Sequence, residues 1–270
     1  MPVNTFFVRL QLLSLMQIGA GSLGMIEKTH LHIPAKVIWG AFTNTLTGML
    51  FPEPGDEQYL QVGEAVAVDG ISTFFPEIDR NRMFPVIPER KWISADGKIS
   101  VSFSEMEAAM LTSAASTSIA PDQMAADRGT LHATDLIRPW IADLSGKKES
   151  PLCFSGYIRL PDAVAGRELD ESVIRLVFDA SRIGGGRKRG WGRVRTVAVE
   201  RTDEYDGLRS IRIPGGELLT ADMEFSPSLR VSGEIRMLSR REYDPVSGSG
   251  HRFTPATLVW STGSVIYDPA

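Results

Sequence analysis

The amino-acid sequence predicts an α+β fold, and three observations support this. Residues 7–13 place apolar and polar side chains in alternation, which is the period of a half-buried strand. Apolar residues recur at helical spacing after Pro34 and again between Leu169 and Ile183. Strand-like alternation dominates residues 201–270. At 270 residues, the chain has room for one large domain or two small ones.

The first 52 residues predict a strand, a loop and a helix. The strand over 7–13 leads into residues 18–24, where glycines allow backbone angles that other residues resist. The helix follows Pro34, which suits a first-turn position, and Pro52 ends it. Its apolar face consists of Ile38, Ala41, Phe42, Thr45, Leu46 and Met49.

The segment over residues 53–150 carries weaker signals. Strand-like runs cover 59–68 and 71–75, and Pro85 with Pro88 indicates a loop. Ser104 and Glu107 match a capping box before a short helix that ends near Leu111. Residues 112–117, rich in Ser, Thr and Ala, predict a surface loop.

The rest of the chain predicts one more helix and several strands. The helix covers 169–183 and runs directly into a glycine cluster. The predicted strands cover 153–160, 193–200, 208–213, 229–237 and 257–266.

The order strand, helix, strands, helix, strand is that of a ferredoxin-like β-α-β-β-α-β unit. We therefore predict a first domain over residues 1–200, with an insertion at about 53–150, and a smaller β-rich domain over 201–270. Because a fold does not define a function, the function has to be inferred from particular residues.

The composition excludes several classes of protein. Hydrophobic residues make up 43% and charged residues 23%, as in ordinary globular proteins. Cys153 is the only cysteine, which excludes a disulfide framework, a cysteine-rich zinc ribbon and an iron-sulfur cluster. Residues 10–24 resemble the apolar part of a signal peptide, but Gln11, Ser14 and Gln17 interrupt them. We predict a soluble, cytoplasmic protein with no targeting segment and no membrane contact.

The most informative segment joins glycines, basic residues and a tryptophan. Between Ser181 and Arg201 there are seven basic residues against Glu200, so this window carries +6 in a chain whose net charge is −4, and the remainder carries −10. Glycines let backbone N–H groups turn toward a phosphate, the basic side chains neutralise it, and an indole offers a face for a base to stack on. The segment is Gly184, Gly185, Gly186, Arg187, Lys188, Arg189, Gly190, Trp191, Gly192 and Arg193.

Other interpretations of this segment remain possible. A Walker loop requires Gly-Lys-Ser/Thr, whereas Trp191 follows Gly190, and a dinucleotide fingerprint opens a helix, whereas this segment closes one. A purely structural alternative makes Gly184 a helix C-cap, the basic residues partners of the helix dipole, and Trp191 a core residue.

This segment resembles the glycine-rich loop of the RAMP superfamily, the RNA-binding subunits of CRISPR effector complexes. Residues 33–41, Ile-Pro-Ala-Lys-Val-Ile-Trp-Gly-Ala, resemble the start of helix one in that family, and the loop at 18–21 precedes them. Residues 117–136, which contain Gly129-Thr130-Leu131-His132, are similar to a middle segment of the capping subunits of type III complexes. The resemblance implies a ferredoxin-like, RRM-like fold and suggests His132 as an RNA contact.

Two departures from the family pattern narrow the expectation. Trp39 and Thr43 stand where the family has Lys and Arg, which leaves Lys36 as the candidate phosphate contact on this helix. Glu27 is the only acid between Gln17 and Lys36, where backbone subunits of the family carry an Asp that cuts target RNA. We therefore predict no target cleavage.

The resemblance implies a non-catalytic subunit of a type III CRISPR complex that grips the 5′ handle of the guide RNA. The residues after the glycine-rich loop match the extension of the capping subunit. The implied partners are guide RNA, a large polymerase-like subunit and backbone RAMP subunits, and we predict no cofactor and no metal. Alternatives are a backbone subunit, a processing endoribonuclease using His30, His32 or His132, and a nucleotide-binding metabolic enzyme.

Three further clusters have open interpretations. His30 and His32 suggest a metal pair or a ribonuclease base, but they also fit packed histidines. Asp203, Glu204 and Asp206 fit a solvated hairpin better than a metal site, and His251 fits a solvated loop. The second basic group either extends the RNA track, contacts a neighbouring subunit or is plain surface; it consists of Arg236, Arg240 and Arg241.

Overall fold

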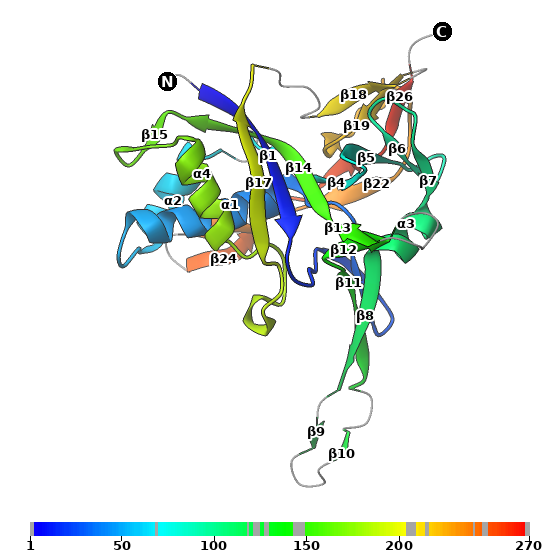
Figure 1. Cartoon of the computed structure of the whole chain (residues 1–270), viewed down its shortest axis with the longest axis horizontal. Helices are drawn as coiled ribbons and strands as arrows, with labels where there is room; N and C mark the ends of the chain where they lie inside the picture. The colour runs from blue at the N-terminus through cyan, green and yellow to red at the C-terminus, as the bar shows by residue number, and fades with distance from the viewer. Residues whose placement is uncertain are drawn as a thin grey trace.

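The fold was analysed in a computed structural model of the whole chain. The structure describes residues 3–67, 70–117, 119–120, 125–126, 130–142, 149–203, 209–213, 216–239, 241–244 and 248–267. Three helices, α1, α2 and α4, lie on one side of the ribbon formed by β17, β1 and β14, and the C-terminal strands β18, β19 and β26 lie on the other side (Figure 1). The chain therefore combines helices and sheets in the α+β manner that the sequence predicts.

A seven-stranded antiparallel sheet forms the centre of the molecule. Strand β1 pairs with β14 from Val3↔Pro161 to Gln11↔Cys153, and with β17 on its other edge. Alternate residues of β1 are buried, as the period of two requires. In spatial order the strands are β17 (Val194–Arg201), β1 (Val3–Leu12), β14 (Cys153–Pro161), β4 (Phe75–Ile78), β5 (Asn81–Val86), β6 (Lys91–Ser94) and β7 (Ser100–Ser102).

Four helices occur in the described part of the chain: α1 (Ala35–Leu50), α2 (Asp56–Ala65), α3 (Phe103–Met110) and α4 (Glu171–Ala180). Helices α1 and α4 pack against each other through Phe42 and Phe178, whose ring centroids are 5.2 Å apart. Asp170 caps α4, because its carboxylate accepts the Val173 N–H at 2.8 Å. The two helices that the sequence predicts most clearly thus share one hydrophobic layer.

A smaller sheet extends away from the central one. It contains β2 (Gly19–Leu23), β3 (Ile26–Thr29), β11 (His132–Ile137) and β8 (Leu111–Ser116), with β11 parallel to β3 and antiparallel to β8. Figure 1 shows β8 and β11 projecting from the body, with β9 (Ile119–Ala120) and β10 (Ala125–Ala126) beyond them. Two further pairs of short strands form two-stranded sheets of their own: β12 (Trp140–Ala142) with β13 (Glu149–Pro151), and β15 (Ala163–Val164) with β16 (Arg167–Glu168).

The described residues of the C-terminal segment form strands and connecting turns, with no helix. One sheet has the order β18 (Ser210–Ile213), β19 (Gly216–Leu219), β26 (Val265–Tyr267) and β21 (Val231–Ser232). Another has the order β20 (Met223–Glu224), β25 (Thr257–Trp260) and β22 (Ile235–Leu238), and β23 (Arg241–Asp244) pairs with β24 (Gly248–Phe253). Leu218 and Val265 belong to the same hydrophobic cluster as the central sheet, and the Ile87 N–H donates to Gly263 O at 2.9 Å. The division of the chain at residue 200 stays a prediction.

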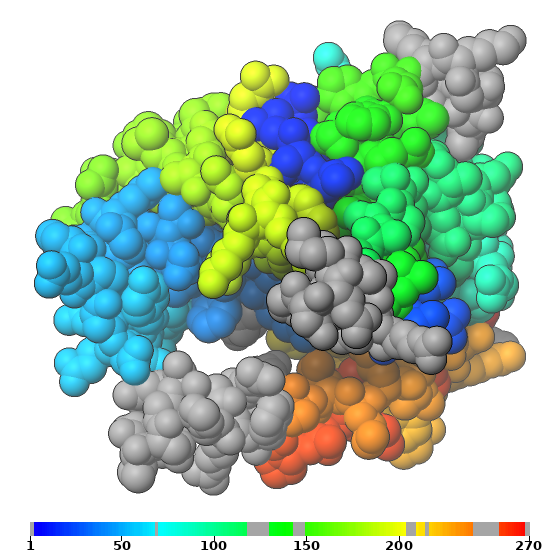
Figure 2. All heavy atoms as spheres, turned by 90° about the horizontal axis from the view of Figure 1, so that it is seen from below, coloured from blue at the N-terminus to red at the C-terminus, as the bar shows by residue number. Residues whose placement is uncertain are grey.

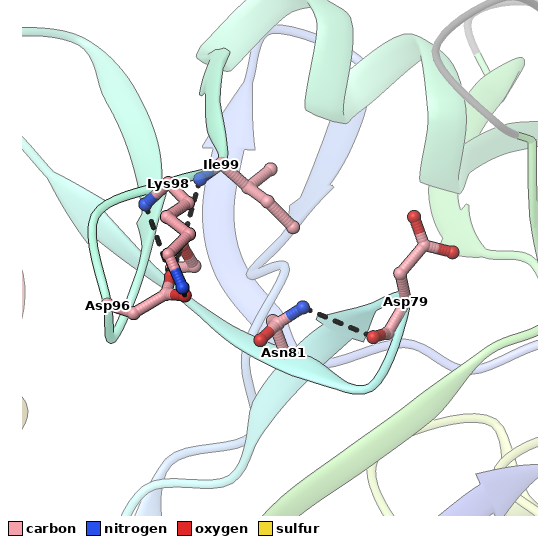
Figure 3. Close-up of polar contacts among 6 residues, drawn as sticks. Asp79, Asn81, Asp96, Lys98 and Ile99 are labelled. Carbon is pink, nitrogen blue, oxygen red and sulfur yellow. Dashed lines mark hydrogen bonds and ion pairs between the residues drawn. The ribbon is translucent and has the colours of Figure 1, made fainter.

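Two hairpin turns of the central sheet are closed by side chains (Figure 3). In the turn between β4 and β5, Asn81 Nδ2 donates to Asp79 O at 3.1 Å. In the turn between β6 and β7, Asp96 accepts hydrogen bonds from Ser94 Oγ and the Lys98 N–H. The Ser94 hydroxyl, and then Lys98, lower the pKa of Asp96 to about 2. These turns bring β5, β6 and β7 onto the edge of β4.

Several elements differ from the sequence prediction. The strand-like run over 59–68 is largely helix α2, because Val62 and Val66, four residues apart, are both buried. The predicted loops over 18–24 and 112–117 contain strands β2 and β8; β2 pairs with the adjacent β3 in a hairpin, and β8 pairs with β11. Pro85 lies inside β5 rather than in a loop.

Some predicted boundaries also move. The capping box of α3 is formed by Ser102 and Glu105, two residues earlier than predicted. Helix α4 ends at Ala180 with Ser181 as its C-cap, so Gly184 is not the cap. The predicted strands over 229–237 and 257–266 are each broken in two, the first around Gly233, whose φ is +158°.

Candidate nucleic-acid interface

The glycine-rich loop is a closed structure between α4 and β17. The Ile183 N–H donates to Gly192 O at 2.9 Å, and Arg182 pairs with Arg193 in an isolated β-bridge. Between these ends, residues Arg187–Arg189 form one turn of 3₁₀ helix. The chain therefore leaves and re-enters the body at one place, and the basic residues lie on the tip.

Glycine is required at both ends of the loop by close backbone contacts. Gly184 has φ +87°, and a Cβ there would lie 2.2 Å from Gln17 O. Gly192 has φ +76°, and a Cβ there would lie 2.0 Å from Ile183 O. Neither position can accept a side chain without displacing backbone. Gly186 has a related role, because its backbone packs against the ring of Trp191.

The loop is fastened to the chain before β2, so part of its backbone is not free to bind a ligand. The Gly185 N–H donates to Gln17 O at 2.8 Å and the Gly192 N–H donates to Leu15 O at 2.7 Å. The Arg193 N–H donates to Ser14 Oγ at 2.9 Å. The expectation that all the glycine N–H groups turn toward a phosphate is therefore wrong for Gly185 and Gly192, which need these bonds to hold the loop.

The side chains at the tip are basic and exposed. Arg187, Lys188 and Arg189 are solvent-exposed, and no carboxylate within the described ranges forms an ion pair with them. The Arg189 guanidinium lies 5.2 Å from the centroid of the half-buried Trp191 ring. Trp191 is thus neither core nor free, since Gly186 and Arg189 already contact it.

A pocket of about 410 Å³, which we call the basic pocket, opens where the loop, β2 and helix α1 meet. Three basic residues from two distant parts of the chain line it, Lys36, Arg182 and Arg187, and no acidic residue among the described ones does. In Figure 2 the yellow-green atoms of the loop region lie directly beside the blue atoms of the N-terminal third. The remaining lining residues are Gln17, Ile18, Gly19, Val37, Gly40, Ala41, Asn44, Gly184 and Gly185.

Comparison with known proteins finds similarity in structure only. No protein-family model and no curated protein sequence matches the chain. Among solved structures, a chain of the type III-B Cmr-beta complex bound to cognate target RNA matches with a TM-score of 0.56 at 9% identity, over 97% of this chain and 86% of that chain. A chain of the same complex bound to cognate target RNA and AMPPnP matches with a TM-score of 0.55 at 13% identity, with the same coverage. This chain has the fold of type III CRISPR subunits.

The fold brings together some of the predicted site residues and separates others. Lys36, Gly184, Gly185 and Arg187 line the pocket. The other predicted loop residues do not line it: Gly186, Lys188, Arg189, Gly190 and Trp191 belong to the outer part of the loop, and Gly192 and Arg193 to its base. His132 lies elsewhere, on β11, where its Nε2 is 3.0 Å from Ser116 Oγ and its Nδ1 is 3.1 Å from Thr130 O. The residues Asp127, Arg128 and Gly129 lie outside the described residues.

Sequence reasoning missed Gln17, Asn44 and Arg182. Arg182 was within the basic window, but the prediction started the site at Gly184. Asn44 lies four residues after Gly40 and eight after Lys36, so all three share one side of α1. That spacing was available from the sequence, whereas the position of Gln17 depends on the fold.

The two family positions at which this chain departs are occupied by packing residues. Trp39 Nε1 donates to Gly63 O at 3.1 Å, which ties α1 to α2. Thr43 is buried on α1. Neither side chain lines the pocket, which leaves Lys36 as its one basic residue from α1.

Glu27, the only acid between Gln17 and Lys36, is engaged by neighbouring side chains. Glu27 Oε2 accepts hydrogen bonds from Gln17 Nε2 at 3.0 Å and from Thr134 Oγ1 at 3.1 Å. It therefore orients Gln17 toward the loop. In the described residues no group of three or more His, Cys, Asp or Glu side chains is placed to hold a metal ion.

His30 and His32 do not reach the basic pocket. Their ring centroids are 5.1 Å apart, and burial lowers the pKa of both, to about 3 for His32. Both rings are therefore neutral near pH 7. Of the other predicted clusters, Glu204, Asp206 and Arg240 fall outside the described residues, and Arg236 pairs with Asp222. Among the described helices, none is long and apolar enough to cross a membrane.

Proposed function

We propose that this chain is a non-catalytic RNA-binding subunit of a type III CRISPR complex that grips the guide RNA at its 5′ handle. The observation that carries the proposal is the pocket in which Lys36, Arg182 and Arg187 converge without an acidic residue. Three cations around one opening suit consecutive phosphates of a single strand.

The pocket supplies different contacts for different parts of a nucleotide. Lys36, Arg182 and Arg187 bind phosphate oxygens, and the exposed Lys188 and Arg189 extend the basic track along the tip. The amides of Gln17 and Asn44 present donors and acceptors to a base edge or a 2′-hydroxyl. Trp191 offers the rest of its ring to a base at the edge of the track.

The arrangement of the central sheet supports the ferredoxin-like part of the proposal. Its first four strands have the order β17-β1-β14-β4, and α1 and α4 pack together on one side of it. This is the order that a β-α-β-β-α-β unit produces when both helices cover one face. The three remaining strands of this sheet, β5, β6 and β7, are additions at the edge of β4.

The proposed role is structural rather than catalytic. His30 and His32 are neutral and away from the basic pocket, and Glu27 is held by Gln17 and Thr134. The acidic remainder of the chain leaves surface for protein partners, namely the large polymerase-like subunit and the backbone subunits, in the cytoplasm. Incubation of precursor RNA with the purified chain is expected to leave the RNA uncut.

The test compares guide RNA with and without its 5′ handle, on the wild type and on Arg187→Ala/Arg189→Ala. We expect the wild type to bind the handle-containing RNA at least about 10-fold more tightly, and the double variant to lose most of that binding. The slope of log Kd against log salt should fall by about 0.7 for each phosphate contact removed from a single strand.

A matched control is Lys98→Ala/Arg167→Ala, which removes the same charge from exposed residues away from the pocket. It should retain wild-type affinity. The proposal would be overturned if the wild type and Arg187→Ala/Arg189→Ala bound the RNAs with and without the handle with equal affinity.

A further inference from the structure

A second pocket, of about 220 Å³, lies between the segment that joins β3 to α1 and the C-terminal strands. On one side it is lined by residues 29–32, and on the other by Arg236, Ser261 and Thr262. It shares no lining residue with the basic pocket. We define it as the histidine pocket.

Polar atoms in this pocket are buried without a partner. Ser261 is 5% exposed, and its hydroxyl has no hydrogen-bond partner within the described chain. Arg236 Nε is also buried and unpartnered. Arg236 is held in place because its Nη2 donates to Asp222 Oδ2, while Asp222 Oδ1 accepts the Thr262 N–H at 3.2 Å. Buried donors of this kind cost free energy unless a ligand satisfies them.

The two histidines add further hydrogen-bonding groups. Neither ring has a hydrogen-bond partner in the part of the chain that the structure describes, and the rings lie 5.1 Å apart. A neutral imidazole carries one N–H donor and one acceptor nitrogen. The histidine pocket therefore offers both kinds of group.

The other walls are flat and apolar. Trp92 is 4% exposed, and its ring lies 6.2 Å from that of Phe103, which also lines the pocket. Pro85 and Ile87 continue this wall. Such a surface suits an aromatic ring, because it buries apolar area without requiring hydrogen bonds from the ring faces.

The charge distribution excludes a phosphate from the interior. Glu107 and Glu234 are exposed lining residues, while the charge of Arg236 is balanced by Asp222. A phosphate would meet two carboxylates and no free cation. A neutral heteroaromatic ring with both donors and acceptors meets no such repulsion.

We propose that the histidine pocket binds one unstacked guanine base. Guanine presents O6 and N7 as acceptors, which suit the imidazole N–H groups of His30 and His32, and it presents N1–H and the 2-amino group as donors, which suit a carboxylate of Glu107 or Glu234. Adenine and cytosine lack a ring N–H beside a carbonyl oxygen, and uracil lacks both N7 and an amino group, so none of them presents this combination.

The base has two sources, a free guanine nucleotide or a base within an RNA strand. The chain from His32 to Lys36 leads from this pocket to the basic pocket, so a strand bound at Lys36 passes within a few residues of the histidines. The RNA source rests on the proposed function; the free-nucleotide source does not.

The first test is titration of the full-length chain with GMP, IMP, AMP, CMP and UMP, followed by NMR of the Trp92 indole N–H and the His30 and His32 imidazoles. GMP is expected to shift all three signals, and IMP, which lacks the 2-amino group, to bind about 10-fold more weakly. The exposed-residue variants Glu107→Gln and Glu234→Gln test the carboxylates, with Glu64→Gln on α2 as the matched control.

We expect at least one of the first two variants to weaken GMP binding about 10-fold, and the control to leave it unchanged. Absence of shifts with GMP, or equal shifts with all five nucleotides, would overturn the assignment. Unchanged GMP binding in both pocket variants would overturn it as well.

The second test compares single-stranded RNAs that differ only in one G or A. The RNA source is supported if the wild type prefers the RNA with G and this preference disappears in Glu107→Gln or Glu234→Gln. In that case Arg187→Ala/Arg189→Ala should weaken binding of both RNAs equally. GMP binding without any RNA preference supports the free nucleotide. If the wild-type chain binds GMP but no RNA, the result contradicts the proposed function and leaves the guanine assignment standing.

Discussion

At the scale of single residues, the surroundings of two glycines and one histidine explain their roles. Gly184 and Gly192 lie where a Cβ would collide with backbone oxygens of Gln17 and Ile183. The basic residues between them can therefore be presented at one place, because the two ends of the loop are fixed to each other and to residues 15–17. A glycine-rich loop is thus rigid at its base and exposed at its tip.

His32 should make stability depend on pH. Its pKa is lowered from 6.5 to about 3, first by burial and then by His30 and Arg236, so the unfolded chain takes up a proton below pH 6.5 that the folded chain refuses until about pH 3. The stabilisation is complete above pH 6.5 and decreases as the pH falls. We expect the wild type to lose about 1–2 kcal/mol more than His32→Gln between pH 7 and pH 5.

Urea unfolding of both proteins at several pH values measures this difference. Parallel curves for wild type and variant would contradict the role of His32. His132→Gln serves as the comparison, since this half-buried ring lies on β11 and contacts Ser116 Oγ and Thr130 O.

At the scale of elements, the turns of the central sheet contain stored backbone strain. Asp79 and Arg80 connect β4 to β5 with φ values of +49° and +67°, a combination that favours glycine or asparagine in a two-residue hairpin. Asn81 Nδ2 donates to Asp79 O and closes this turn (Figure 3).

Arg80→Gly should stabilise the hairpin. Glycine adopts a positive φ without the steric cost that arginine has there, so we expect the free energy of unfolding to rise by about 0.5–1 kcal/mol. Thermal or urea unfolding measures the change. Arg167→Gly, in strand β16, is the control and should lower stability; a loss of stability in both variants would contradict the explanation.

At the scale of the whole molecule, the C-terminal strands and the central sheet contribute to one hydrophobic cluster. Leu218 on β19 and Val265 on β26 are buried within it. The cluster favours a single unfolding transition, even though strands β18 to β26 form sheets separate from the central one.

Leu218→Ala tests whether the chain unfolds as one unit. Removal of a fully buried leucine side chain is expected to cost about 2–4 kcal/mol. If the molecule unfolds cooperatively, calorimetry should show one transition at a lower temperature, and circular dichroism should report the same midpoint. A second transition that moves alone would instead support an independent C-terminal domain.

Local sequence patterns were sufficient to predict three main elements of the fold and the position of the glycine-rich loop. Alternation over 7–13 and helical spacing after Pro34 and Leu169 predicted β1, α1 and α4, because each buries one face against a large core. The concentration of glycine and basic residues located the loop, since its charge and backbone requirements are contained within one segment.

The tertiary structure decided what depends on distant partners. Residues 112–117 are too small and polar to predict a strand, yet all but the last of them pair with β11. Residues 59–68 read as a strand, and packing against α1 made most of them helix. Only the fold places Gln17, Lys36 and Arg182 around one opening, because pockets join side chains whose separation in sequence gives no periodic signal.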